Sequence, residues 1–298
     1  MDVLLTNLLQ YTIDGALRGM LYAVIALAFI VIYRAGRILN FAQGEIVIFG
    51  GYLIFTFFSW KIFPFWIALA FSFAMAIFLG LMIERIIFRP LIGQPIWAIV
   101  MVTIGLMILL QGITLVIWGG SERPFPVVFP RAPVKLGKLT FTGVIFWGGM
   151  ISFLIIFVLS WLFEKTRWGL KLTAVAEDHQ VAQSMGISVR KSIAIAWVFG
   201  CVLSSFAAIV FLNGQTLTVG ASMIGLQALP VVLLAGLESI WGAPLAGIMV
   251  GVGESWAAAY LDPYTGGAMS EAFPYIIMLV SLLIRPQGLF GWKIIERI

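Results

Sequence analysis

Apolar runs of about membrane-spanning length follow one another along almost the whole chain, and this pattern restricts the fold more than any other feature. The runs are separated by charged or Pro/Gly breaks and lie near residues 13–33, 41–59, 65–88, 95–118, 141–163, 192–212, 221–237, 243–260 and 272–284. A helix that crosses the hydrocarbon core needs about 20 predominantly apolar residues. Of the 298 residues, 62% are hydrophobic and 10% are charged, whereas a soluble domain carries about a quarter charged residues. We therefore expect an all-α, polytopic helical bundle embedded in the lipid bilayer.

The runs predict eight or nine membrane helices. The segment 221–260 leaves the number open, because Pro230 interrupts its first arm and several glycines thin its second. It forms either two full spans or a broken, re-entrant pair. No linker divides the chain, so we expect a single transmembrane domain over residues 1–298.

The positions of the basic residues predict the orientation. The longest polar interruption, residues 164–192, holds Lys165, Arg167, Lys171, Arg190 and Lys191. Cytoplasmic loops are enriched in Lys and Arg, so we place this segment in the cytoplasm. Alternation from there gives an external N-terminus and a cytoplasmic C-terminus. The proline-rich segment 119–140 is then an ordered external loop.

One apolar run begins with amides, in the stretch RILNFAQGEIVIFGGYL at residues 37–53. On a helix, Asn40, Gln43 and Gly44 share a face with Val47 and the glycine pair at 50–51, because residues three and four apart are neighbours. A polar and small face should point into the protein rather than toward lipid.

Two interpretations of this terminus stay open, and they are compatible. Asn40 and Gln43 have the spacing of a capping box that closes a helix terminus. Alternatively, Asn40, Gln43, Gly44 and Glu45 lie at a broken helix and line a water-filled path, as polar groups do in transporters. Glu45 is on a different helical face, and we expect it to reach Arg34 or Arg37.

Glu254 is the other acid inside an apolar run. Intramembrane carboxylates are rare and usually face protein or water. Glu254 is either part of a substrate path or proton relay, or a polar contact between helices, and the second reading is favoured. We expect Gln111 and Gln227 to be buried contacts between helices.

Enzyme chemistry has few candidate residues here. The only histidine, His179, has no cysteine or histidine companion, so we expect no metal site. A phosphate-binding loop needs glycine directly before its Lys-Ser pair, whereas Lys191 and Ser192 follow Arg190. Transport powered by ATP would therefore need an ATPase on another chain.

The polar segment contains LTAVAEDHQVAQSMGI, which lacks proline and predicts a short helix ending before Gly186. This helix is either a solvated connector or a docking helix that inserts into a groove of a partner.

Four separated stretches together resemble a known family: NFAQGEIVIFGGYL, AVAEDHQVAQSMGISVRKSIAIAWVFGCVLSSFAAIV, LPVVLLAGLESIWGAPLAGIMVG and the terminal RPQGLFG. They are similar to permeases of branched-chain amino acid ABC importers, in particular the smaller of the two paired permeases. The resemblance implies a bacterial or archaeal inner-membrane subunit. Its implied partners are a second, homologous permease, two cytoplasmic ATPase subunits that bind ATP and Mg, and an external solute-binding protein. It implies no nucleic acid and no cofactor in this chain.

The resemblance also assigns residues. It implies that the segment from Ala176, Glu177 and Asp178 to Gly186 couples the permease to the ATPase. The turn marked by Gly236, Ser239 and Gly242 is implied to be a structural element on the cytoplasmic side.

The sequence departs from the family pattern at three positions. Gln43 stands where the family commonly has histidine, and Glu238 and Trp241 stand where small residues or proline are frequent. The solute is therefore open among branched-chain amino acids, other amino acids, amides and urea. The rival hypothesis is an ion-coupled secondary transporter or channel that uses Glu45 or Glu254.

Overall fold

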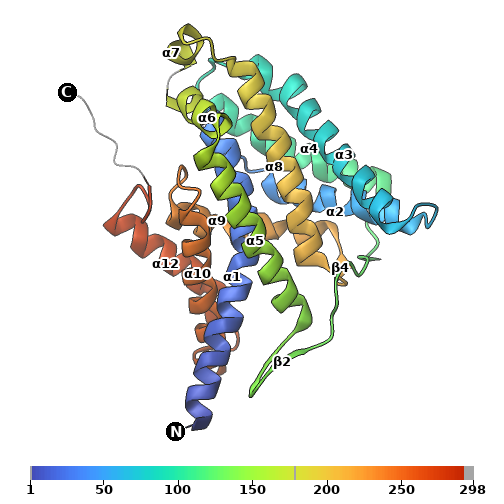
Figure 1. Cartoon of the computed structure of the whole chain (residues 1–298), viewed down its shortest axis with the longest axis vertical. Helices are drawn as coiled ribbons and strands as arrows, with labels where there is room; N and C mark the ends of the chain where they lie inside the picture. The colour runs from blue at the N-terminus through green and yellow to red at the C-terminus, as the bar shows by residue number, and fades with distance from the viewer. Residues whose placement is uncertain (1, 178, 292–298) are drawn as a thin grey trace. The chain divides into compact units, whose positions relative to one another are not determined.

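The structure, a computed structural model, describes residues 2–177 and 179–291 and is predominantly helical (Figure 1). The helices are α1 (Asp2–Gly36), α2 (Gln43–Ser59), α3 (Phe65–Ile83), α4 (Ile96–Trp118), α5 (Gly143–Lys165), α6 (Arg167–Glu177), α7 (His179–Ser184), α8 (Val189–Leu212), α9 (Ile224–Ala235), α10 (Gly242–Tyr260), α11 (Asp262–Thr265) and α12 (Ala268–Ile284). A π-helical turn η1 (Glu84–Phe88) and the 3₁₀ turns η2 (Arg89–Leu91) and η3 (Val219–Met223) connect them.

Each apolar run of the sequence forms a helix. Within the described residues, five helical stretches are long and apolar enough to cross a membrane: Leu5–Gly36, Phe65–Leu91, Ile96–Trp118, Gly143–Lys165 and Val189–Leu212. The prediction of an all-α polytopic membrane protein is confirmed. The number of spans and the re-entrant pair stay predictions, because α2, α12 and the stretch Val219–Ala235 are apolar but shorter.

Four very short strands lie in the connections, and the sequence did not predict them. β1 (Arg123–Pro124) pairs antiparallel with β4 (Thr216–Leu217), and β2 (Val134–Leu136) forms a hairpin with β3 (Leu139–Phe141). The segment 119–140 is thus held by backbone pairing at both ends.

The chain divides into two compact units whose segments alternate along the sequence. Unit 1 consists of Met1–Leu27, Phe129–Val158 and Gln227–Ile298, and unit 2 consists of Ala28–Val128 and Leu159–Leu226. The prediction of one transmembrane domain stays a prediction.

In unit 2, α2 packs against α3, α4 and α8, and α3 also packs against α8. Glycines allow these helices to approach closely. A Cβ added at Gly80 of α3 would lie 2.8 Å from the Trp197 carbonyl oxygen and 2.9 Å from the Val198 Cα. The Phe88 ring stacks on Trp197 with ring centroids 4.2 Å apart. Contact between small residues replaces the hydrophobic effect as the main source of helix association in lipid.

A buried ion pair holds the turn after α3 in unit 2. The Glu84 carboxylate is 1% exposed and accepts two hydrogen bonds from Arg89, at 3.1 Å and 3.0 Å. Such a bidentate pair is directional. It fixes the π-helical turn that carries Phe88.

In unit 1, α10 packs against α12. An added Cβ at Gly15 would lie 2.6 Å from the Gly251 carbonyl oxygen, so α1 and α10 also meet through glycines. The terminal RPQGLFG stretch packs on the turn after α9, where the Leu289 N–H donates to the Leu234 carbonyl at 2.8 Å.

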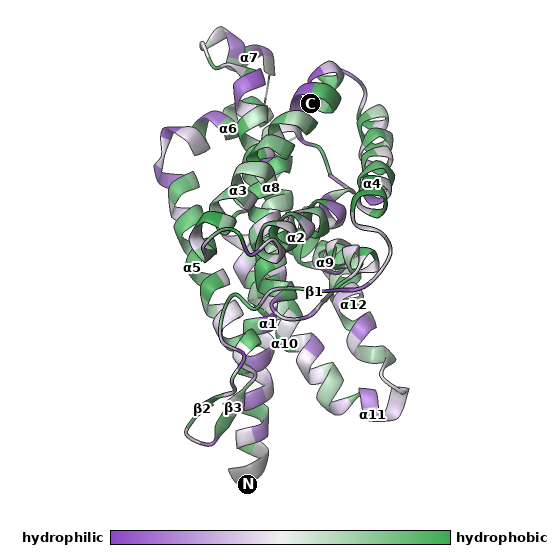
Figure 2. Ribbon diagram, turned by 90° about the vertical axis from the view of Figure 1, so that its right-hand side faces the viewer, coloured by the Kyte–Doolittle hydropathy of each residue, from purple (hydrophilic) through white to green (hydrophobic). Residues whose placement is uncertain are grey.

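Large apolar side chains are exposed along the membrane-length helices of unit 2. On α3 and α4, Trp66, Phe78, Met101, Ile108 and Val116 are 57% to 87% exposed. Figure 2 shows α4 almost entirely hydrophobic, in contrast to the hydrophilic α7. An apolar surface of this extent is expected against lipid or a partner helix and not against water.

We predict that Gly80→Leu destabilises the chain because the side chain would overlap the α8 backbone. Overpacking of this kind costs about 1–3 kcal/mol. The measurement is the temperature at which the detergent-solubilised chain loses its monodisperse gel-filtration peak. Gly105→Leu on α4 is the matched control, since an added Cβ there meets no atom within 4 Å. Equal loss in both variants would contradict the packing argument.

Candidate functional site

The amides at the start of α2 form a fully buried hydrogen-bonded chain in unit 2. Asn40 and Gln43 are both 0% exposed. The Asn40 Oδ1 accepts from the Ala42 N–H at 3.1 Å, and its Nδ2 donates to the Gln43 Oε1 at 3.0 Å. The Gln43 Nε2 donates to the Ser204 Oγ of α8, which donates onward to the Gly200 carbonyl at 2.7 Å. The cluster therefore fastens the connection between α1 and α2 to α8.

The predicted capping box is wrong. The residue that caps α2 is Ala42, which provides no side-chain hydrogen bond. The Asn40 side chain instead accepts a local hydrogen bond from the Ala42 N–H. The Gln43 side chain donates to Ser204 on α8. A buried amide forms the bonds that its tertiary neighbours offer, because an unsatisfied one is costly. The prediction that this polar and small face points into the protein is confirmed by its burial.

Gly44 and Glu45 contact the η3 turn and the start of α9 in unit 2. An added Cβ at Gly225 would lie 2.5 Å from the Gly44 Cα. Glu45 is 5% exposed and faces the Ser222 hydroxyl. The prediction that Glu45 reaches Arg34 or Arg37 is wrong, since both arginines turn toward α6. The structure thus brings Asn40, Gln43, Gly44 and Glu45 together, while their place on a translocation path stays a prediction.

Two arginines join the end of α1 to α6. The Arg34 guanidinium donates to the Thr173 hydroxyl. The Arg37 Nη2 lies 3.6 Å from the Glu177 Oε2, and both side chains are about half exposed. Thr173 and Glu177 are four residues apart, on one face of α6. Arg37 itself has a left-handed backbone, with φ of 51°, which turns the chain sharply three residues before Asn40.

The predicted coupling segment is helical on both sides of Asp178. α6 ends at Glu177 and α7 begins at His179, and Asp178 lies outside the described residues. Leu172 and Val175 of α6 are buried, so this helix packs into the core of unit 2. The prediction that the helix stops before Gly186 is confirmed, since α7 ends at Ser184 and Gly186 has a left-handed φ of 76°. Ala176 and Glu177 face the cavity described next.

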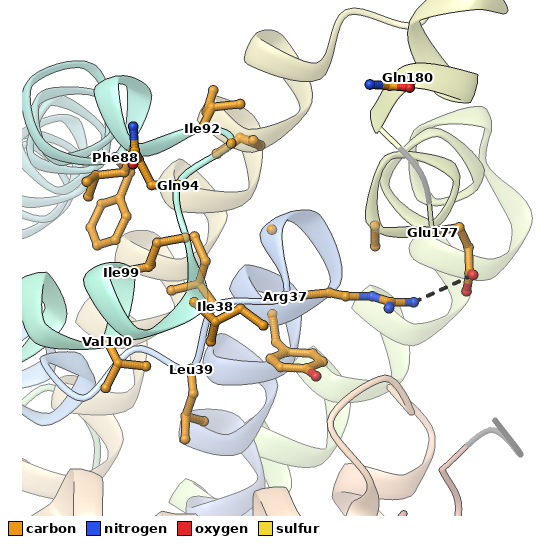
Figure 3. A pocket seen from close by; sticks show the side chains of 17 residues that line it. Arg37, Ile38, Leu39, Phe88, Ile92, Gln94, Ile99, Val100, Glu177 and Gln180 are labelled. Carbon is orange, nitrogen blue, oxygen red and sulfur yellow. Dashed lines mark ion pairs between the residues drawn. The ribbon is translucent and has the colours of Figure 1, made fainter. Parts of the chain in front are cut away.

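A cavity of about 670 Å³ opens in unit 2 between the α1–α2 connection, the α3–α4 connection and α6. Its lining includes the apolar side chains of Ile38, Leu39, Phe88, Leu91, Ile92, Ile96, Ile99, Val100 and Ile193. Its polar side chains include Arg37, Gln94, Glu177 and Gln180. Figure 3 shows the Arg37–Glu177 ion pair on one side, with Ile38, Ile99 and Val100 on the other side of Arg37. Sequence reasoning missed this cavity, because its walls come from segments far apart in the chain.

The glycine-rich turn of unit 1 is closed by a hydrogen bond to the Ser239 side chain. Gly236 has a left-handed φ of 84°, and the Ser239 Oγ accepts from the Gly242 N–H at 3.0 Å. An added Cβ at Gly236 would lie 2.6 Å from the Gly291 backbone. Two of the stretches that carry the family resemblance therefore pack on each other.

Glu254 makes a contact between helices of unit 1. The Tyr22 hydroxyl donates to its Oε1 at 3.3 Å. This is the contact expected for a polar link between α1 and α10, and it leaves the role in a substrate path untested. The prediction for Gln111 and Gln227 is wrong, because both side chains are exposed. Within residues 2–177 and 179–291, no three His, Cys, Asp or Glu residues gather as a metal site would require.

Comparison with known proteins identifies the family. Residues 11–282 match the model of the family described as branched-chain amino acid transport system / permease component. The chain belongs to this family. It is therefore a multi-pass membrane permease component of a transport system, as the four sequence stretches indicated.

Individual relatives align over almost their whole length. The chain is 28% identical to the high-affinity branched-chain amino acid transport system permease protein BraD of Pseudomonas aeruginosa, over 97% of this chain and 98% of that protein. It is 26% identical to the LivH permease protein of Escherichia coli K12, over 97% of each. It is 28% identical to the probable branched-chain amino acid transport permease protein LivH of Methanocaldococcus jannaschii, over 93% and 91%.

We predict that Gln43→Leu lowers the stability of the chain by about 1–3 kcal/mol, because it leaves the Asn40 amide and the Ser204 hydroxyl with a missing buried partner. Thermal loss of the gel-filtration peak in detergent measures this. Gln111→Leu is the matched control, since its amide is exposed on α4. If the two variants melt alike, the buried amide chain does not stabilise this connection.

Proposed function

We propose that the chain is the membrane-spanning permease subunit of an ATP-driven importer for branched-chain or related amino acids. Its membership of the permease family and the names of its relatives support this. The proposal includes a second, homologous permease, two ATPase subunits that carry ATP and Mg, and an external solute-binding protein that delivers the amino acid.

The observation that carries the coupling part of this proposal is an exposed apolar surface on the most polar segment. Trp168 and Leu170 of α6, Val181 of α7 and Met185 directly after α7 are 55% to 77% exposed. These two helices lie at one end of α8 (Figure 1). In the sequence they connect the membrane-length helices α5 and α8. Exposed apolar residues on a short helix outside the membrane favour a groove in a partner. We assign that groove to the ATPase.

The orientation follows from this assignment. Docking to the ATPase places α6 and α7, with Ala176, Glu177 and Gly186, on the cytoplasmic face of the inner membrane. The N-terminus is then external, and the segment 119–140 faces the solute-binding protein. Lys293 and Arg297, which support a cytoplasmic C-terminus by their charge, lie outside the described residues.

The geometry suggests how ATP would act on the membrane region. When the ATPases close, they move α6 and α7. The contacts Arg34–Thr173 and Arg37–Glu177 transmit that movement to the α1–α2 connection. This connection carries Asn40 and Gln43, which are bonded to α8 through Ser204. A displacement at the cytoplasmic face would therefore reach the helices of unit 2 through a continuous set of contacts.

The direct test is uptake by the purified complex in proteoliposomes. We expect accumulation of L-leucine that requires ATP, the partner subunits and the solute-binding protein. Uptake by this chain alone, driven by a proton or sodium gradient, would instead establish the rival ion-coupled mechanism through Glu45 or Glu254. The Glu254 carboxylate accepts a hydrogen bond from Tyr22, which fits a contact between helices.

We predict that Val181→Glu combined with Met185→Glu releases the ATPase and abolishes coupled uptake. Burying each apolar side chain contributes about 1.5 kcal/mol or more, so the double variant should weaken association at least about tenfold. Co-purification of the ATPase with the chain is the readout. Gln183→Glu adds the same charge to α7 without removing an apolar contact, and it should retain the ATPase. Full retention by the double variant would rule out docking at α7.

A further inference from the structure

The cavity of unit 2 combines an apolar wall with one cation and one anion. Among its described lining residues, Arg37 and Glu177 are the charged ones. Phe88 and Ile193 are almost fully buried, and Ile38, Leu91, Ile92 and Ile99 pack against the same core cluster. The apolar wall is therefore fixed by the core, whereas the charged side chains are about half exposed.

We propose that this cavity binds a free α-amino acid with an apolar side chain. The Arg37 guanidinium binds its carboxylate, Glu177 binds its ammonium group, and the wall formed by Ile38, Ile99 and Val100 receives its side chain. This inference rests on the proposed function, because it takes the solute to be an amino acid.

The charges favour a zwitterion over a simple ion. An anion at Arg37 would meet the Glu177 carboxylate, and a cation at Glu177 would meet the Arg37 guanidinium, since the two groups are 3.6 Å apart. An α-amino acid carries a carboxylate and an ammonium group attached to the same carbon. It can insert between the two side chains and pair with both, and Arg presents a fork that suits a carboxylate.

Opening the ion pair costs little. An exposed pair contributes little to stability because water screens it. The ligand replaces it with two charge-assisted contacts and buries its apolar side chain on the wall. The volume of about 670 Å³ lies within the usual range of about 300–1,000 Å³ for ligand pockets.

The position of the cavity suits a late step of transport. Leu39 lines it and directly precedes Asn40, while Glu177 and Gln180 of the coupling segment lie on the opposite side (Figure 3). A bound amino acid would bridge the α1–α2 connection and α6, so movement of α6 would change the site itself. The cavity is then an exit site on the cytoplasmic side.

The test is equilibrium binding of tritiated L-leucine to the complex that co-purifies with this chain, in lipid nanodiscs without the solute-binding protein. Leucinamide, which lacks the carboxylate, and 4-methylpentanoate, which lacks the ammonium group, serve as competitors. Both should bind more weakly than leucine. Arg37→Gln and Glu177→Gln should each weaken leucine at least about tenfold, as expected for loss of a charged contact.

The analogues separate a binding role from a structural one. Arg37→Gln should not weaken leucinamide and Glu177→Gln should not weaken 4-methylpentanoate, because each change removes only a charge of the same sign as the analogue's and frees the charge that binds it. A variant that had merely distorted the fold would weaken every ligand. Arg190→Gln, an exposed arginine at the start of α8, is the matched control and should bind leucine normally. Val100→Phe narrows the apolar wall and should also reduce leucine binding.

Three results would overturn the inference: leucine affinity that is unchanged in both charge variants, analogues that bind the wild-type chain as tightly as leucine, or no binding of leucine, isoleucine, valine or phenylalanine up to about 10 mM. ATP-dependent uptake combined with any of them would leave the proposed importer standing without this site. Leucine binding that follows the expected pattern without ATP-dependent uptake would preserve the site and reject the importer.

Discussion

A polar group that leaves water without a hydrogen-bond partner is costly, and much of the architecture follows from that cost. Hydrocarbon offers no hydrogen bonds, so the spanning segments are helices that satisfy their own backbone. The same requirement joins Asn40, Gln43 and Ser204 into one buried chain. Because each amide needs the next, the irregular connection between α1 and α2 has a fixed position against α8.

Close helix approach depends on small residues for a related reason. Lipid tails are as apolar as the helices, so van der Waals contact and polar links drive association. Gly80 admits the α8 backbone in unit 2, and Gly15 meets Gly251 in unit 1. Along much of α4, large apolar side chains are exposed, as expected for a surface against lipid or a partner helix.

The α1–α2 connection, which the buried amides fix, also contacts the segment proposed to dock on the ATPase. Arg34 and Arg37 tie it to α6, and α6 and α7 both carry exposed apolar side chains. The exposed ion pair is weak, so in the proposed transport cycle it would open and close while the buried amides stay bonded. In the proposed mechanism, the buried amides keep the α1–α2 connection fixed, and the ion pair is the contact that changes.

The sequence by itself determined the fold class, the position of each apolar helix and the family, because run length, charge placement and the four stretches are local features. It also located, along the chain, the polar segment 164–192 and the end of a helix before Gly186. Only the tertiary structure decided the partners of the polar side chains: Gln43 bonds Ser204, which lies 161 positions away, and Glu45 faces Ser222 in place of an arginine. The cavity at Arg37 and Glu177 likewise could not be predicted from the sequence, because its walls form only when the α1–α2 connection, the α3–α4 connection and α6 pack together. Side-chain partners depend on distances in space, and a linear pattern does not contain them.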